Sequence, residues 1–134
     1  MKKTLLMLAA LLCCCFALKA QDFTIDNLNY SITGTNPPTV ALTGKVYGNT
    51  IHNLVIPSTV TYGGTAYSVT SIRDDAFRDC SDLTGSLTIG DAVTSIGGCA
   101  FERCTSLSGT LTLGSSVTSI GNYAFRSCPL KGSL

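Results

Sequence analysis

The sequence has few charged residues, a single histidine and no tryptophan. Charged residues make up 13% of the 134 residues and hydrophobic residues 45%, whereas typical soluble domains contain about one quarter charged residues. Because intrinsic disorder requires low hydrophobicity and high charge, we expect most of the chain to fold. The formal net charge of +1 argues against a nucleic-acid-binding protein, which needs clustered lysines and arginines.

The first 20 residues, MKKTLLMLAALLCCCFALKA, have the layout of a bacterial secretory signal peptide. Two lysines precede an apolar run from Leu5 to Leu18, and a polar stretch follows it. This run is too short for a membrane span, which needs about 20 apolar residues. Cleavage after Ala17 and cleavage after Ala20 both stay open, and a loose lipobox ending at Cys13 makes lipid anchoring a weaker alternative. We therefore expect a secreted or cell-surface protein with no stable membrane span after signal cleavage.

The C-terminal half of the chain repeats with a period of 24 residues. The segments SIRDDAFRDCSDLTGSLTIGDAVT, SIGGCAFERCTSLSGTLTLGSSVT and SIGNYAFRSCPLKGSL begin at Ser71, Ser95 and Ser119. A fixed period of about 20 to 50 residues is typical of solenoids, in which stacked units cover one another's apolar faces. The chain stops at Leu134, where the next strand should begin, so we expect a truncated array.

Each unit divides into three parts. Leu87-Thr88-Ile89 and Leu111-Thr112-Leu113 alternate between apolar and polar residues, which predicts short strands that stack in parallel one repeat apart. The β-branched stretch Val93–Ile96 predicts a second extended segment. The A-F-x-x-C pattern over residues 100–104 predicts a single α- or 3₁₀-helical turn that points inward. The expected fold is a repeat solenoid, mainly β, with short helical turns.

The chain before residue 71 departs from the strict repeat. Residues 54–60 (LVIPSTV) match the strand half of a unit, and residues 61–69 interrupt it. Gly63-Gly64 lies between Thr- and Tyr-rich arms of this insertion, which predicts a β-hairpin. Residues 21–53 are interpreted as an antiparallel β cap, because a solenoid needs a polar-faced terminal unit for solubility. The predicted organisation is a signal peptide over 1–20, a cap over 21–53 and repeats over 54–134.

Four of the seven cysteines lie outside the signal peptide, and three of them follow the period. Cys80, Cys104 and Cys128 are single residues on successive coils, whereas structural zinc needs four converging ligands. Parallel side chains on stacked coils also hold their Cβ atoms farther apart than an ordinary disulfide allows. We interpret the three as a structural ladder of buried, unpaired thiols. Cys99 lies outside this ladder, and pairing with Cys104 and a free thiol both stay open.

No group of residues indicates catalysis or a bound cofactor. His52 is the only histidine and is expected in a surface loop, and no serine lies in a Gly-x-Ser-x-Gly pattern. The acidic residues of the first unit are interpreted as part of a solvated mixed-charge face with Arg73 and Arg78, in preference to a calcium site: Asp74, Asp75, Asp79 and Asp82. We expect no enzymatic activity, no metal and no cofactor.

The segments VTSIRDDAFRDC, VTSIGGCAFERC and VTSIGNYAFRSC, with LVIP or LTIG before them, resemble the BspA-type leucine-rich repeat. The resemblance covers residues 54–134 and is specific, because the Val-Thr-Ser-Ile, Ala-Phe and Cys signatures recur together. It implies a right-handed leucine-rich-repeat solenoid in a secreted or cell-surface protein. Such proteins are usually assigned to adhesion or ligand binding and not to catalysis.

We therefore expect an extracellular protein or glycan as the partner, bound by the parallel-stranded face. Thr88 and Thr112 are the candidate contact residues on this face. Tyr62 and Tyr67 lie in the hairpin segment, where core packing and a binding patch both stay open. Two further hypotheses are a structural or accessory segment of a larger surface protein without its own ligand, and a fragment of a secreted hydrolase.

Overall fold

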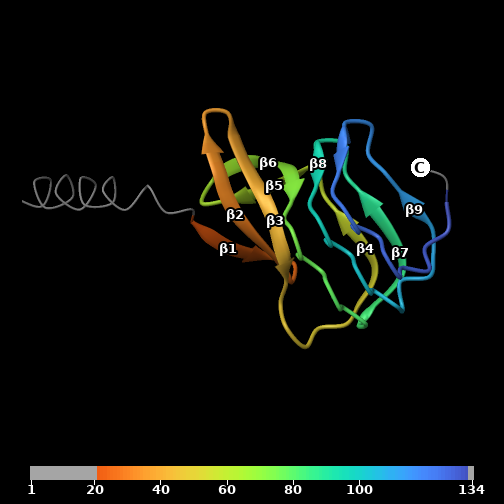
Figure 1. Ribbon diagram of the computed structural model, residues 1–134. Coiled ribbons are helices and arrows are strands. Elements are labelled where there is room, and N and C mark those ends of the chain that lie inside the picture. Colours follow the sequence, from red (N-terminus) through yellow and green to blue (C-terminus); the bar gives the residue numbers. More distant parts are fainter. Residues whose placement is uncertain (1–20, 133–134) are drawn as a thin grey trace, which may run out of the picture.

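The computed structural model describes residues 21–132, which form two β-sheets connected by turns (Figure 1). The predicted signal peptide lies outside the described residues. One sheet has the strand order β1-β2-β3-β6-β8-β10, with β5 also paired to β6, and the second has the order β4-β7-β9. The strands are β1 (Asp22–Ile25), β2 (Leu28–Thr35), β3 (Pro38–Lys45), β4 (Ile51–Ile56), β5 (Thr59–Tyr62), β6 (Thr65–Ile72), β7 (Leu83–Ile89), β8 (Ser95–Ile96), β9 (Leu111–Thr112) and β10 (Ser119–Ile120).

The 24-residue period sets the register of both sheets. β7 and β9 run parallel with Leu87 opposite Leu111. β8 and β10 run parallel with Ile96 opposite Ile120. Equivalent residues of consecutive repeats therefore lie side by side, as in a solenoid that adds one strand to each sheet per coil. The prediction of parallel, stacked strands is confirmed.

The interrupted first coil also contributes to both sheets. β4 pairs in parallel with β7, and Leu54 lies opposite Leu87. These two leucines are 33 residues apart in the sequence, nine more than the period, because residues 61–69 are inserted between the two halves of the coil. The insertion brings β5 and β6 together as an antiparallel hairpin. Gly63 and Gly64 form its turn with φ of 58° and 80°, left-handed values that favour glycine.

The cap consists of the antiparallel strands β1, β2 and β3, as predicted. β3 then pairs in parallel with β6, with Leu42 opposite Ile72. The cap therefore extends the sheet of the repeats as well as covering the first coil, and Figure 1 shows it beside the hairpin of β5 and β6. The boundary predicted between residues 53 and 54 falls inside β4.

A column of stacked phenylalanines runs through the core of the repeats. Phe77, Phe101 and Phe125 occupy the same position on three consecutive coils. Their ring centroids are 5.0 and 5.4 Å apart, with 7° and 2° between successive ring planes. Phe77 and Phe101 are fully buried, whereas Phe125 on the last coil is partly exposed. The period thus places identical side chains in one layer of the core, where each coil covers the apolar surface of the coil before it.

The helical turn expected over residues 100–104 is not formed, and residues 21–132 contain no helix. The chain makes two separate turns, in which the carbonyls of Cys99 and Phe101 accept hydrogen bonds from the amides three residues later (3.1 and 3.3 Å). Cys99 and Arg103 have φ of 56° and 57°, and such left-handed residues interrupt a right-handed helix. The amide of Phe101 instead donates to the carbonyl of Ala124 on the next coil (2.7 Å). Hydrogen bonds between coils therefore replace those within a helix.

Candidate binding surface

The outer side of the β4-β7-β9 sheet carries a row of outward-pointing side chains. Neighbouring residues of a strand point to opposite faces, so Leu54 and Leu87 are buried while the residues after them point outward. Val55 lies opposite Thr88, and Thr88 lies opposite Thr112. We call Val55, Thr88 and Thr112 the outer row. Val55 is 58% exposed, and the structure places the two predicted contact residues, Thr88 and Thr112, side by side.

Side-chain hydrogen bonds connect the three coils where the strands of this sheet begin. Asn53 Oδ1 accepts a hydrogen bond from the amide of Ser86, and Ser86 Oγ accepts one from the amide of Thr110, both at 2.9 Å. His52 lies in β4 and not in the expected loop, because the pairing of β4 with β7 extends to Thr84. His52 Nδ1 is 3.0 Å from Thr84 Oγ1. These contacts hold the strands of the outer row in a fixed register.

Tyr62 and Tyr67 do not lie on this sheet. They belong to β5 and β6 of the other sheet, and both are partly buried. The ring of Tyr62 stacks on Phe23 with a centroid separation of 4.2 Å and 2° between the planes. The ring of Tyr67 is 6.2 Å from Phe23. The two tyrosines therefore pack against the cap and are separate from the outer row.

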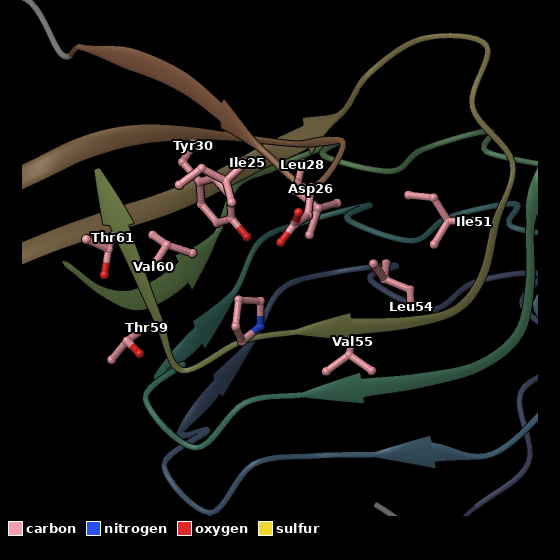
Figure 2. A pocket seen from close by; sticks show the side chains of 11 residues that line it. Ile25, Asp26, Leu28, Tyr30, Ile51, Leu54, Val55, Thr59, Val60 and Thr61 are labelled. Atoms are coloured by element: carbon pink, nitrogen blue, oxygen red, sulfur yellow. The ribbon is translucent and has the colours of Figure 1, made fainter. Parts of the chain in front are cut away.

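A pocket of about 390 Å³ lies between the cap and β4 (Figure 2). We call it the junction pocket. Its walls are mostly apolar and include Ile25, Leu28, Leu54 and Val60. Val55 also lines it, so the pocket adjoins one end of the outer row. The sequence did not indicate this pocket, because its walls come from separate segments that only the fold brings together.

Two polar groups, the carboxylate of Asp26 and the hydroxyl of Tyr30, point into the junction pocket (Figure 2). Burial and the negative charge of Asp26 raise the pKa of Tyr30 to about 12. The Tyr30 hydroxyl is therefore protonated at neutral pH and can both donate and accept a hydrogen bond. Asp26 lies in the turn between β1 and β2, and its carboxylate takes part in none of the ion pairs of the described residues.

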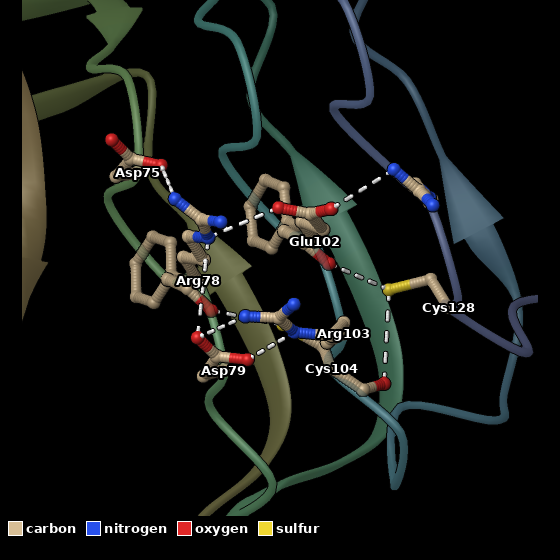
Figure 3. A network of polar contacts seen from close by, with 10 residues as sticks. Asp75, Arg78, Asp79, Glu102, Arg103, Cys104 and Cys128 are labelled. Atoms are coloured by element: carbon tan, nitrogen blue, oxygen red, sulfur yellow. Dashed lines mark hydrogen bonds and ion pairs between the residues drawn. The ribbon is translucent and has the colours of Figure 1, made fainter.

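A ladder of charged side chains connects the turns of successive coils (Figure 3). Arg103 donates hydrogen bonds of 2.5 and 2.8 Å to both carboxylate oxygens of Asp79 on the preceding coil. Glu102 is only 4% exposed and lies between arginines of the two neighbouring coils. Its carboxylate oxygens are 3.0 Å from Arg78 Nε and 3.7 Å from Arg126 Nη1. This network is structural, because its charges are paired within the protein.

Sequence reasoning missed the role of Glu102, although a signal for it exists. Residues 78, 102 and 126 occupy the same position of successive repeats and alternate as Arg, Glu and Arg. Opposite charges at one position of neighbouring coils lie close enough to pair, because equivalent residues stack one strand spacing apart. Alternating charge at the repeat period therefore indicates an ion-pair ladder.

The pairing of Asp79 with Arg103 should make stability depend on pH. The hydrogen bonds from Arg103 hold the pKa of the Asp79 carboxyl below its usual value. The stabilisation is therefore present above the unfolded pKa of about 3.9 and is lost as the pH falls through the lower pKa of the folded state. We expect Arg103→Gln to raise the pKa of Asp79 in an NMR titration. Arg126→Gln, which removes an arginine that makes no ion pair with Asp79, should leave this pKa unchanged, and equal effects of the two variants would contradict the assignment.

The thiols of the ladder donate hydrogen bonds to the preceding coil. Cys104 Sγ is 3.0 Å from the carbonyl oxygen of Phe77, and Cys128 Sγ is 3.1 Å from that of Phe101. Burial raises the pKa of the Cys80 thiol. Within residues 21–132 all four cysteines are free, namely Cys80, Cys99, Cys104 and Cys128. In the same part of the chain, no three His, Cys, Asp or Glu side chains gather as a potential metal site.

Parallel strands stacked at 24-residue intervals, with inward-pointing leucines in one sheet and short strands in the other, define a leucine-rich-repeat solenoid. The family model described as BspA type Leucine rich repeat region (6 copies) matches residues 70–132. None of the curated proteins compared with the chain matches it. In the part of the chain that the structure describes, no helix has the length and apolar character needed to cross a membrane.

Three similar solved structures are leucine-rich-repeat proteins of bacteria. A leucine-rich repeat protein from Bacteroides capillosus is 32% identical with a TM-score of 0.69, and the match covers 82% of this chain and 78% of that protein. One from Bacteroides ovatus is 35% identical with a TM-score of 0.72, covering 84% of this chain and 29% of that protein. A leucine rich cell surface protein from Faecalibacterium prausnitzii is 30% identical with a TM-score of 0.68, covering 83% and 29%. The chain thus spans less than a third of the length of the last two.

The chain belongs to the BspA-type leucine-rich-repeat family. The resemblance noted in the sequence and the solenoid fold that it implies are both confirmed.

Proposed function

We propose that this protein is a non-enzymatic binding module, secreted or displayed at the cell surface, whose ligand is an extracellular protein or glycan. The observation that carries this proposal is the outer row, which stays accessible on a sheet whose other side is buried in the core. Family membership supports the proposal, as does the cell-surface description of the Faecalibacterium prausnitzii relative. The N-terminal sequence, with its basic start and apolar run, supports export.

The chemistry of the outer row suits recognition of a polar polymer. Threonine hydroxyls donate and accept hydrogen bonds, and parallel strands repeat them at intervals of about 4.8 Å. The side chains are short and β-branched, so little rotamer freedom is lost when a ligand orders them. The row is also tied into a fixed register by Asn53 and Ser86. Each additional coil would extend the same surface, which allows several weak contacts to act together.

A double substitution on the outer row tests the proposal. The purified protein should first be screened against immobilised extracellular matrix proteins and a glycan array, and the affinity for each hit measured by biolayer interferometry. Thr88→Glu/Thr112→Glu should weaken binding by at least about tenfold, because two carboxylates would lose water without gaining partners. The protein should stay folded, because both side chains point away from the core.

Thr35→Glu is the matched control, since Thr35 is an exposed threonine in β2 of the cap. It should bind as the wild type does. A folded wild-type protein without saturable binding to any partner would contradict the proposal and favour an accessory segment without its own ligand. Unchanged affinity of the double variant would contradict the assignment of the outer row.

A further inference from the structure

The outer row lacks the residue types that carry most of the binding energy at protein interfaces. Such hot spots are enriched in Trp, Tyr and Arg and insert into well-packed pockets of the partner. The row itself consists of one valine and two threonines. A tight complex therefore needs an anchor beside the row, and the junction pocket begins at Val55 (Figure 2).

The oxygens of the junction pocket define the polar end of a ligand that would fit. Tyr30 is only 1% exposed, and Figure 2 shows its hydroxyl and the Asp26 carboxylate turned toward the space between the cap and β4. No lysine, arginine or histidine lines the pocket, so the Asp26 charge is not neutralised there. A cation that donates hydrogen bonds would satisfy both oxygens, whereas an anion would be repelled.

The other walls of the junction pocket suit an apolar stem. Leu28, Leu54 and Val60 are buried side chains that line it, and long basic side chains cover such surfaces with their methylene groups while the charged end reaches a polar partner. Among biological cations, the guanidinium of arginine has a planar fork of donors that can serve two oxygens at once. The ammonium of lysine is a compact point charge that lacks this geometry.

The position of β4 indicates that the cation belongs to a polypeptide. β4 is an edge strand that pairs with β7 alone among the described strands. An open edge accepts backbone hydrogen bonds from an extended segment, which a free amine does not provide. A segment lying along this edge would present alternate side chains toward the protein.

We propose that the junction pocket binds an arginine side chain on an extended segment of a partner protein. The guanidinium contacts Asp26 and Tyr30, and the methylene stem packs on Leu54 and Val60. This inference rests on the proposed function, because the arginine is the anchor of a ligand that also covers the outer row.

The test is an NMR titration of the isotope-labelled protein with a capped five-residue peptide, Thr-Val-Arg-Val-Thr. We expect saturable shifts of the backbone amides of Asp26, Val55 and Val60. The same peptide with citrulline, which is isosteric with arginine but neutral, should bind at least tenfold more weakly. The lysine peptide should lie between them. Equal affinity for the arginine and citrulline peptides, absence of saturable binding, or shifts confined to other parts of the protein would each overturn the inference.

Variants separate the pocket from general charge attraction. Asp26→Asn should weaken binding of the arginine peptide about tenfold and abolish its preference over the citrulline peptide. Asn also accepts the left-handed φ of 50° found at this position, so the fold is retained. Asp22→Asn removes the same charge from an exposed position in β1 outside the pocket and should leave the affinity unchanged. Equal losses in the two variants would overturn the inference.

Thr88→Glu/Thr112→Glu distinguishes this inference from the proposed function. If the peptide fails to bind while the double variant loses a protein or glycan ligand, only the pocket inference is overturned. If the peptide binds as described but no such ligand is found, only the proposed function is overturned.

Discussion

Replacing Phe101 by alanine should destabilise the protein by about 3–5 kcal/mol. Phe101 is fully buried between Phe77 and Phe125, and its ring stacks on both. The substitution removes the transfer free energy of the ring, leaves a cavity, and breaks two aromatic contacts of about 0.5–1.5 kcal/mol each. Small domains are stable by only about 5–15 kcal/mol, so this one change threatens the fold. Urea unfolding followed by circular dichroism measures the loss.

Phe125→Ala is the control for Phe101→Ala. Phe125 is partly exposed and has one stacked neighbour, Phe101, at 5.4 Å. Because the cavity would open to solvent, we expect roughly half the loss. Equal losses in the two variants would show that the column of rings is not a continuous core.

Replacing Gly97 by alanine should have the second largest effect, about 3 kcal/mol or more. A Cβ atom at Gly97 would lie 2.5 Å from Asp74 Oδ1 and 2.6 Å from the carbonyl carbon of Arg73, and it would also overlap the backbone nitrogen of Asp74. The neighbouring coil cannot move away without breaking the hydrogen bond from Gly97 N to Ile72 O, which is 2.8 Å long. This glycine is needed for the close approach of two backbones, and we expect a lower urea midpoint for the alanine variant.

Gly98→Ala is the matched control, one residue further along the chain. A Cβ atom there would lie 3.5 Å from the carbonyl oxygen of Asn122 and 3.8 Å from Asp74 Oδ1, which are ordinary contacts. We therefore expect a change within about 0.5 kcal/mol. A loss as large as that of Gly97→Ala would mean that general glycine effects, and not the contact with Asp74, limit stability.

Local signals were sufficient for most of the fold. The recurrence of Ile72, Ile96 and Ile120 at one offset predicts stacked parallel strands, because equal spacing along the chain becomes equal height in each coil. Gly63-Gly64 predicts the hairpin, because only a few residue types accept the left-handed φ of a tight turn. The helical turn over residues 100–104 was wrong for a complementary reason. The A-F-x-x-C spacing fits a helix, but the amide of Phe101 bonds to the next coil, which local sequence does not indicate.

The candidate site was only partly predictable. Thr88 and Thr112 were placed on one face by strand alternation and the period, both of which are local patterns. Val55 joins them because β4 pairs with β7 across the hairpin insertion. Tyr62 and Tyr67, by contrast, were ambiguous, since an aromatic residue suits a core as well as a binding surface, and their packing on Phe23 depends on how the cap folds back.

The sequence by itself determined the repeat, its period, the positions of most strands and the family, because a pattern that recurs every 24 residues specifies which residues stack. Tertiary structure alone decided the junction pocket, the open edge of β4 and the burial of Glu102 between two arginines. The physical reason is that the pocket walls come from residues 25–30 and 51–61, which share no periodic pattern. The pairing of β3 with β6 joins the cap to the first coil, and only this contact between distant segments forms the pocket.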